Sequence, residues 1–161
     1  VQAHDVLAND MQFANKKVVV IGGGITGLET ALYINRQGTN QVSVVDMLPE
    51  WPVDMLDMRY QNAALLEVRH FKDQGVALFY NNKVVKFADG KLFIESTKDG
   101  EVKELPADVI VLSVGVKPND ALWQELLASG HPSVWKAGDA IATGKINKAV
   151  LHGSKVGYSQ N

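Results

Sequence analysis

Runs of consecutive apolar residues mark the first structural elements of this chain. Residues 18–21 are all Val or Ile, and residues 109–112, which follow Asp108, are all Val, Ile or Leu. Unbroken runs of this kind are typical of strands buried on both faces of a parallel sheet. Residues 42–46, which are mostly apolar, and residues 76–79, which are all apolar, predict two more strands.

Helical spacing follows the first of these strands. Apolar residues recur at positions 25, 28, 31, 32 and 34, and Gly38 provides a stop, so we predict a helix there. Further helices are predicted over residues 58–74, 121–127 and 145–158. The polar residues 1–15 predict a linker.

Strand-like segments with turn signals between them occupy the middle of the chain. Residues 83–87, 91–96 and 101–105 are separated by Asp89-Gly90 and Asp99-Gly100. Asp-Gly pairs favour tight hairpins, which predicts an antiparallel meander. A last strand is predicted at residues 134–137. This order predicts an α/β fold, a Rossmann-like parallel sheet with an antiparallel β-meander insertion.

Composition excludes several function classes. The 161 residues are 46% hydrophobic and carry a net charge of −2, which favours a globular protein that binds neither nucleic acid nor a membrane. Without cysteine, the chain itself can hold no disulfide or iron–sulfur cluster, and the cytoplasm is the expected location. The four histidines lack metal-ligand spacing, and no nucleophile has an adjacent base. We therefore expect no metal site and no catalytic residue.

A glycine-rich turn carries the main functional signal. It follows the first buried strand, opens the first helix, and consists of Gly22, Gly23, Gly24, Ile25, Thr26 and Gly27. This is the G-x-G-x-x-G pattern of dinucleotide-binding domains. Gly22 would allow the tight turn, Gly24 would let the backbone approach a pyrophosphate, and Gly27 would let the helix pack closely. The alternative is a turn without a ligand.

Asp46 ends the second predicted strand, 19 residues after Gly27. A carboxylate at this place accepts hydrogen bonds from an adenosine ribose. Because no Lys or Arg lies between Gln37 and Met58, nothing nearby in sequence would neutralise a 2′-phosphate. Asp46 therefore favours NAD over NADP, unless it is an ordinary solvated residue at a strand end.

Three motifs together resemble the pyridine-nucleotide-dependent flavoprotein oxidoreductase superfamily. Residues 17–31 are similar to its NADH-domain fingerprint, and residues 114–119 to the motif that returns the chain to the FAD domain. Residues 137–140 are similar to its late Gly-Asp motif. Residues 144–153 and 4–7 most resemble the NADH:flavin oxidoreductase branch that contains 2,4-dienoyl-CoA reductase, enoate reductase and trimethylamine dehydrogenase.

This resemblance implies roles for four more residues. Glu29 matches a glutamate near the nicotinamide, and Gly115 a position where bare backbone passes close to NAD. Gly138 and Asp139 match the pair whose aspartate meets the ribityl chain of FAD. The alternatives are a helix-surface Glu29, a plain turn at Gly115 and an Asp139 that caps the last helix. Lys136 departs from the small or apolar residue usual in the family, which puts a normal FAD fit in doubt.

Spacing indicates what the chain lacks. It holds one glycine fingerprint, and 115 residues separate Gly24 from Asp139, which leaves room for one βαβ domain. We therefore expect a linker at 1–15, an NADH-binding domain at 16–116 and the C-terminal segment of an FAD-binding domain at 117–161. The expected function is to bind NADH and pass its hydride to a flavin held mainly by other domains of the parent, so the isolated chain would be inactive. The alternative is a non-catalytic module that binds NAD or ADP or serves as an interaction surface.

Overall fold

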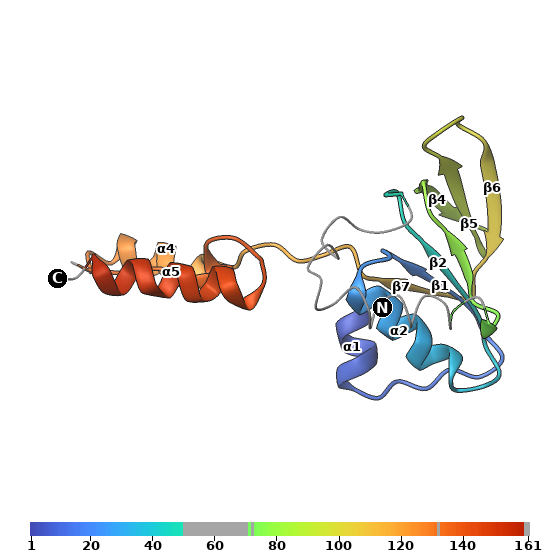
Figure 1. The fold of residues 1–161 in the computed structure, drawn as a ribbon, viewed down its shortest axis with the longest axis horizontal. Helices are drawn as coiled ribbons and strands as arrows, with labels where there is room; N and C mark the ends of the chain where they lie inside the picture. Colours follow the sequence, from blue (N-terminus) through green and yellow to red (C-terminus); the bar gives the residue numbers. More distant parts are fainter. Residues whose placement is uncertain (50–70, 72, 132, 160–161) are drawn as a thin grey trace. The chain divides into compact units, whose positions relative to one another are not determined.

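The computed structural model describes residues 1–49, 71, 73–131 and 133–159. The chain divides into two compact units, the first ending at Val114 and the second beginning at Gly115 (Figure 1). The division falls two residues before the boundary expected from the sequence.

The first unit is built on a parallel sheet of four strands. These are β1 (Lys17–Ile21), β2 (Gln41–Val45), β3 (Ala77–Phe79) and β7 (Val109–Leu112), in the order β3-β2-β1-β7. Every neighbouring pair is parallel, so all four strands end at the same edge. The predicted α/β fold with a central parallel sheet is confirmed.

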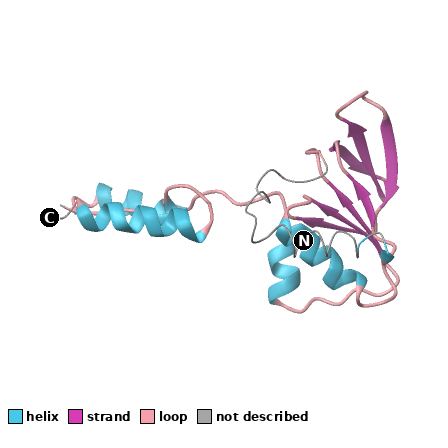
Figure 2. Ribbon diagram, viewed as in Figure 1, coloured by secondary structure: helices cyan, strands magenta, loops and turns pink. Residues whose placement is uncertain are grey.

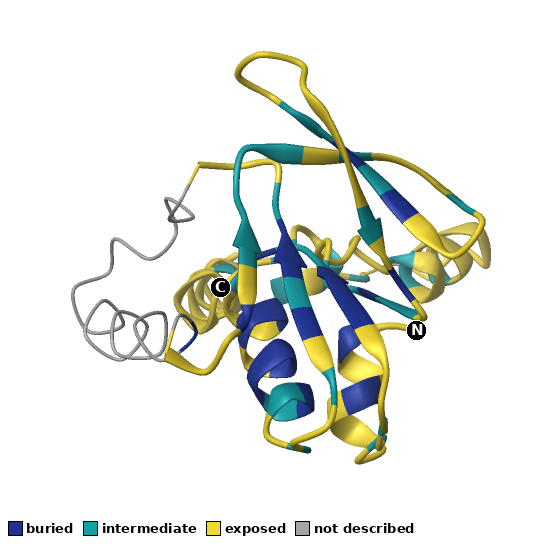
Figure 3. Cartoon of the chain, turned by 90° about the vertical axis from the view of Figure 1, so that its right-hand side faces the viewer, coloured by how far each residue is buried: buried dark blue, intermediate teal, exposed yellow. Residues whose placement is uncertain are grey.

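Two helices cover one face of this sheet, α1 (Ala3–Ala8) and α2 (Ile25–Asn35) (Figure 1). Successive side chains of β1 point to opposite faces of the sheet and so contribute to two separate hydrophobic clusters. Val18 and Val20 pack with the helices, while Val19 belongs to a second cluster on the opposite face. All three are almost fully buried, as expected for a strand covered on both sides (Figure 3).

The prediction of a linker over residues 1–15 is wrong for its first part. Ala3 and Val6 of α1 are buried in the core. The terminal amino group of Val1 donates a hydrogen bond to the carbonyl of Ile110, and Gln2 forms a bridge with Leu112 of β7. A helix of six residues with two buried positions repeats no pattern, so the sequence carried too little periodicity to indicate it.

The antiparallel meander covers the opposite face of the sheet (Figure 2). It consists of β4 (Asn82–Ala88), β5 (Lys91–Ser96) and β6 (Val102–Pro106), in that order. Asp89 and Gly90 have φ values of 52° and 71°, which is the left-handed pair that a type I′ hairpin requires. Leu92 and Ile94 of β5 pack against Val19, and this contact holds the meander on the sheet.

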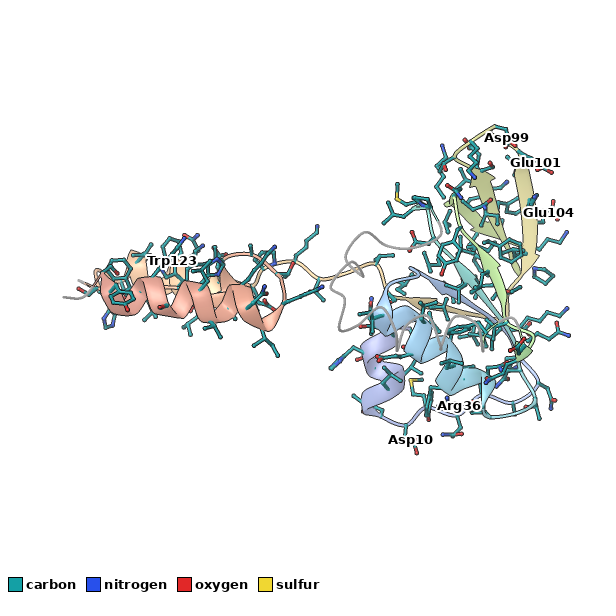
Figure 4. All side chains as sticks on the ribbon, in the orientation of Figure 1. Asp10, Arg36, Asp99, Glu101, Glu104 and Trp123 are labelled. Carbon is teal, nitrogen blue, oxygen red and sulfur yellow. The ribbon has the colours of Figure 1, made fainter. Side chains whose placement is uncertain are left out.

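Charged pairs join neighbouring strands of the meander. Lys91 contacts Glu104 at 2.6 Å and Lys83 contacts Glu95 at 2.8 Å. Figure 4 labels Glu104 among the side chains that extend from β6. These pairs are largely exposed, so each stabilises the fold by at most about 1 kcal/mol. The meander therefore presents an ordinary solvated outer face.

The second unit contains α4 (Ala121–Ala128), the short 3-10 helix η2 (Gly138–Ala140) and α5 (Ile146–Tyr158). None of these helices has a buried residue. The strand predicted at residues 134–137 is absent. A strand needs a partner for its backbone groups, and the described part of this unit offers none.

Two further observations complete the fold. Most of the helix predicted over residues 58–74 lies outside the described residues. Among the helices that the structure describes, none is long and apolar enough to cross a membrane.

Candidate functional site

The three glycines of the G-x-G-x-x-G pattern have three different surroundings. Gly22 has a φ of +107°, and a Cβ there would lie 2.2 Å from the carbonyl oxygen of Ser113. A Cβ on Gly27 would lie 1.9 Å from the carbonyl oxygen of Gly22. A Cβ on Gly24 would meet nothing within 4 Å. Gly22 and Gly27 are thus needed by the fold itself, while Gly24 borders open space.

That open space lies at the N-terminus of α2. Gly24 is the N-cap residue of α2, and no side chain caps the helix there. The backbone carbonyl of Gly24 accepts the first hydrogen bond of the helix from the N–H of Leu28, at 2.9 Å. The first N–H groups of a helix have no partner within the helix, and they carry its positive dipole end. The first turn is accessible, because Ile25 and Thr26 are exposed, and it holds no acidic residue that would repel an anion. The arrangement is suited to a phosphate group.

Asp46 connects this loop to the next strand. Its Oδ2 accepts a hydrogen bond from the backbone N–H of Gly23 at 2.5 Å, and its Oδ1 accepts one from Leu48 at 2.8 Å. A half-buried carboxylate therefore lies directly beside the glycine loop. The structure brings together Gly22–Gly27 and Asp46, which lie far apart in the sequence.

Two residues that the sequence patterns did not indicate adjoin the same loop. The ring atom Cε1 of Tyr80 lies 3.1 Å from the position that a Cβ on Gly23 would take. The Cβ of Ser113 lies 3.2 Å from the corresponding position on Gly27. Both residues directly follow a strand of the parallel sheet. Their place at the carboxyl edge, where open α/β sheets bind ligands, was the signal available in the sequence.

Glu29 lies on the exposed side of α2, one turn beyond the loop. Its side chain has no described role in the core. The geometry agrees with either expectation, a surface glutamate or a residue that faces a bound nicotinamide.

The remaining predicted site residues belong to the second unit. Gly115 has a φ of +87° and open space where a Cβ would be. Gly138 has a φ of +60°, and a Cβ there would contact Ala149 of α5 at 3.5 Å. Asp139 accepts a hydrogen bond from the backbone N–H of Gly144 at 3.2 Å. Asp139 thus holds the loop ahead of α5, whose N-cap is Lys145.

Lys136, the departure from the family pattern, makes contacts within its own unit. Its Nζ lies 2.7 Å from Oδ2 of Asp120 and 4.1 Å from the ring centre of Trp123, the residue of this unit that Figure 4 labels. Trp123 in turn donates from Nε1 to the carbonyl of Val134 at 3.3 Å. The lysine therefore ties α4 to the segment before η2.

No group of acidic or histidine residues in the described ranges is arranged to hold a metal ion. The described site thus contains a glycine loop, a helix N-terminus and a carboxylate. These groups can bind and orient a nucleotide.

Comparison with known proteins gives relatives that match almost the whole chain. It is 32% identical to the NADH oxidase of Thermoanaerobacter brockii over 98% of its own length, but this is only 23% of that protein. Two solved structures share the fold at 20% identity. Histamine dehydrogenase from Rhizobium sp. 4-9 has a TM-score of 0.83, with 96% of this chain and 25% of that chain covered. The 6-hydroxypseudooxynicotine amine oxidase of Pseudomonas geniculata N1 has a TM-score of 0.84, with 98% and 24% covered.

The family match over residues 2–153 agrees with the superfamily that the motifs predict. The chain spans about a quarter of the length of each of these three proteins. Residues 2–153 match the family described as pyridine nucleotide-disulphide oxidoreductase. This chain belongs to the pyridine nucleotide-disulphide oxidoreductase family.

Proposed function

We propose that this chain is the NADH-binding part of a larger FAD-dependent oxidoreductase. The observation that carries the proposal is the open space above Gly24, at the N-terminus of α2 and next to the carboxylate of Asp46. The helix terminus matches the charge of a pyrophosphate, and the carboxylate matches the hydroxyls of a ribose. The glycine loop that leads into α2 follows β1, and Asp46 follows the neighbouring strand β2.

The charge around Asp46 supports NADH as the nucleotide. A 2′-phosphate would be placed against a carboxylate, and residues 37–58 contain no Lys or Arg to offset the repulsion. A free 2′-hydroxyl can instead donate a hydrogen bond to the same carboxylate. NADH should accordingly bind more tightly than NADPH.

The chain's own residues bind and orient the nucleotide. Backbone N–H groups of the glycine loop hold the pyrophosphate, and Asp46 holds the adenosine ribose. NADH, when bound, supplies the hydride, and the flavin of the parent accepts it. We propose that Glu29 and Gly115 lie near the nicotinamide end. No side chain of the chain is assigned a proton-transfer role.

The second unit supports the existence of further domains. Seven of its large apolar side chains are more than half exposed: Val116, Leu122, Trp135, Ile146, Val150, Leu151 and Tyr158. A unit with this much apolar surface, and with no buried residue among those that the structure describes, is poorly stabilised alone. Large exposed apolar patches mark surfaces that are covered by other protein. The relatives are about four times as long as this chain, so in them further protein is present that could cover such a surface. We propose that residues 117–161 are the C-terminal segment of an FAD domain, in which Gly138 and Asp139 contact the flavin.

A second candidate is a module that binds NAD or ADP without turnover, or serves only as an interaction surface. The observation that favours it is that each carboxylate oxygen of Asp46 already accepts a hydrogen bond from a backbone N–H. These bonds hold the loop in place without any nucleotide. The carboxylate would then be structural.

Calorimetric titration of the chain with NADH, NADPH and ADP tests the proposal. Binding of NADH and ADP, with weaker NADPH, supports it. If none of the three binds to the folded chain, the interaction-surface candidate takes its place. Turnover is tested in the parent flavoprotein, where anaerobic mixing with NADH should bleach the flavin. A flavin that stays oxidised while NADH binds would favour the module without turnover.

A further inference from the structure

Tyr80 lies two strands away from the glycine loop, and Asp46 lies on the strand end between them. Tyr80 directly follows β3, at the carboxyl edge of the parallel sheet. The sheet order β3-β2-β1-β7 puts the ends of three strands side by side at this edge, with the glycine loop after β1, Asp46 after β2 and Tyr80 after β3. Neighbouring strands lie about 4.8 Å apart. Each step from one strand end to the next is therefore comparable to the size of one part of a nucleotide, such as its ribose.

A nucleotide bound as proposed must run along this edge. Its phosphates lie over Gly24 after β1, and its ribose meets Asp46 after β2. The base is attached to the far side of the ribose from the phosphate. In a nucleotide bound as proposed, the base would therefore continue in the same direction, toward the end of β3 and Tyr80.

Local contacts place the tyrosine ring on this path. The Cε1 atom of Tyr80 lies 3.1 Å from the position of a Cβ on Gly23, and Oδ2 of Asp46 lies 3.2 Å from the same position. The ring and the carboxylate are thus neighbours on one side of Gly23. The backbone on either side of the ring is fixed, because Asp46 donates to the carbonyl of Phe79 at 3.0 Å and Asn82 donates from Nδ2 to the carbonyl of Tyr80 at 2.8 Å.

From this arrangement we infer that Tyr80 contacts the nucleotide base and favours a purine. The inference rests on the proposed function. A partly exposed aromatic ring beside the ribose-binding carboxylate offers an apolar surface to a flat base, and stacking is stronger for a base with a larger π-face. Adenine would gain more from the ring than a pyrimidine would. Tyr80 thereby adds selectivity for the base to the selectivity of Asp46 for the ribose.

The test compares ADP with UDP, each measured by competition against a fluorescent ADP analogue. Tyr80→Ala should weaken ADP binding about tenfold or more, which is the range for loss of one stacked aromatic partner. It should weaken UDP less, so that the ratio of the two affinities falls. Tyr80→Phe, which keeps the ring, should retain ADP binding within about threefold. Phe87→Ala removes an exposed aromatic ring from the meander and should change neither affinity.

The other outcomes distinguish failure of the Tyr80 inference from failure of the proposed function. Unchanged ADP binding by folded Tyr80→Ala overturns the base contact and leaves the proposed function standing. Equal weakening of ADP and UDP also overturns it, because a ring that only supports Gly23 and Asp46 would affect both nucleotides alike. If Tyr80→Ala does not fold, the ratio of ADP to UDP affinity is measured in Tyr80→Leu instead. An unchanged ratio in Tyr80→Leu overturns the inference. An unsubstituted chain that binds neither ADP nor NADH removes the proposed function, and the inference with it.

Discussion

The backbone N–H of Gly23 donates a hydrogen bond to Oδ2 of Asp46 over 2.5 Å. The bond joins the loop after β1 to the end of β2, and the same carboxylate also accepts from Leu48. Asp46 therefore has two tasks under the proposed function. It holds the glycine loop in place, and it presents negative charge where the ribose of a nucleotide would lie.

Substitution of Asp46 should alter the choice between nucleotides. Asp46→Ala removes both the charged hydrogen bond to the 2′-hydroxyl and the repulsion of a 2′-phosphate. NADH binding should weaken by about 1.5–3 kcal/mol, while NADPH binding should change less, so the gap between them narrows. Isothermal calorimetry with both nucleotides measures this. If the unsubstituted chain binds both equally, Asp46 has no role in the choice.

Asp108 offers a matched control for this prediction. Its Oδ2 accepts a hydrogen bond from the backbone N–H of Lys17 at 2.8 Å, at the opposite end of β1. Asp108→Ala removes a carboxylate with a similar backbone contact, but far along the strand from the glycine loop. It should cost some stability and leave the ratio of NADH to NADPH affinity unchanged.

The parts of the fold that sequence could predict depend on local chemistry. Residues 18–21 are all apolar, as expected for a strand that is covered on both faces, and the structure buries Val18, Val19 and Val20 in that way. Asp89-Gly90 adopts the left-handed pair of φ values that a two-residue hairpin needs. The glycine spacing placed Gly22 and Gly27 correctly, since their steric roles are set by the turn itself.

The parts that sequence could not predict depend on distant partners. The helix at Ala3–Ala8 is explained by its contact with the core and not by its own pattern. The missing strand at residues 134–137 had suitable residues but lacks a partner strand. The order of strands in the sheet brings Asp46 to Gly23 and Tyr80 beside both. A short sequence motif does not predict that order.

The chain should be purified without flavin. It has one glycine fingerprint, and its Gly-Asp segment lies in a unit with no buried residue, so the contacts that hold FAD are expected mainly outside it. An absorption spectrum of the purified protein should lack the visible bands of flavin. A yellow protein with one flavin per chain would contradict this.

Lys136 should control the titration of Asp120. The hydrogen bond from Lys136 lowers the pKa of the Asp120 carboxyl below its usual value, and a second bond from Gln124 acts in the same direction. A lowered folded-state pKa means that the stabilising effect is complete above the unfolded value, near 3.9, and is lost as the pH falls through the folded value. Lys136→Met should therefore move the midpoint of the Asp120 carboxyl upward in an NMR titration.

The control for this titration is Lys155→Met, in the last turn of α5. It removes the same charge from the same unit without touching Asp120, so the midpoint should stay where it is. An Asp120 midpoint that does not move in Lys136→Met would show that the contact between the two side chains is not maintained in solution.

Gly24 and Gly27 allow binding and folding to be separated by a pair of similar substitutions. Gly24 has a φ of −69°, which any residue adopts, and a Cβ there meets nothing within 4 Å. Gly24→Val should leave the circular dichroism spectrum unchanged and the stability within about 0.5 kcal/mol, as for other substitutions that disturb no contact. Its side chain would fill the space that the pyrophosphate needs, so NADH binding should fall below detection in calorimetry.

Gly27→Ala should do the reverse. Its Cβ would lie 1.9 Å from the carbonyl oxygen of Gly22, so α2 must move away from the loop. Overpacking of this kind costs about 1–3 kcal/mol, visible as a lower melting temperature. The contrast between the two variants is the decisive result, because one loses binding while folded and the other loses stability first. If folded Gly24→Val binds NADH as tightly as the unsubstituted chain, the loop is only a structural turn, and the interaction-surface candidate is favoured.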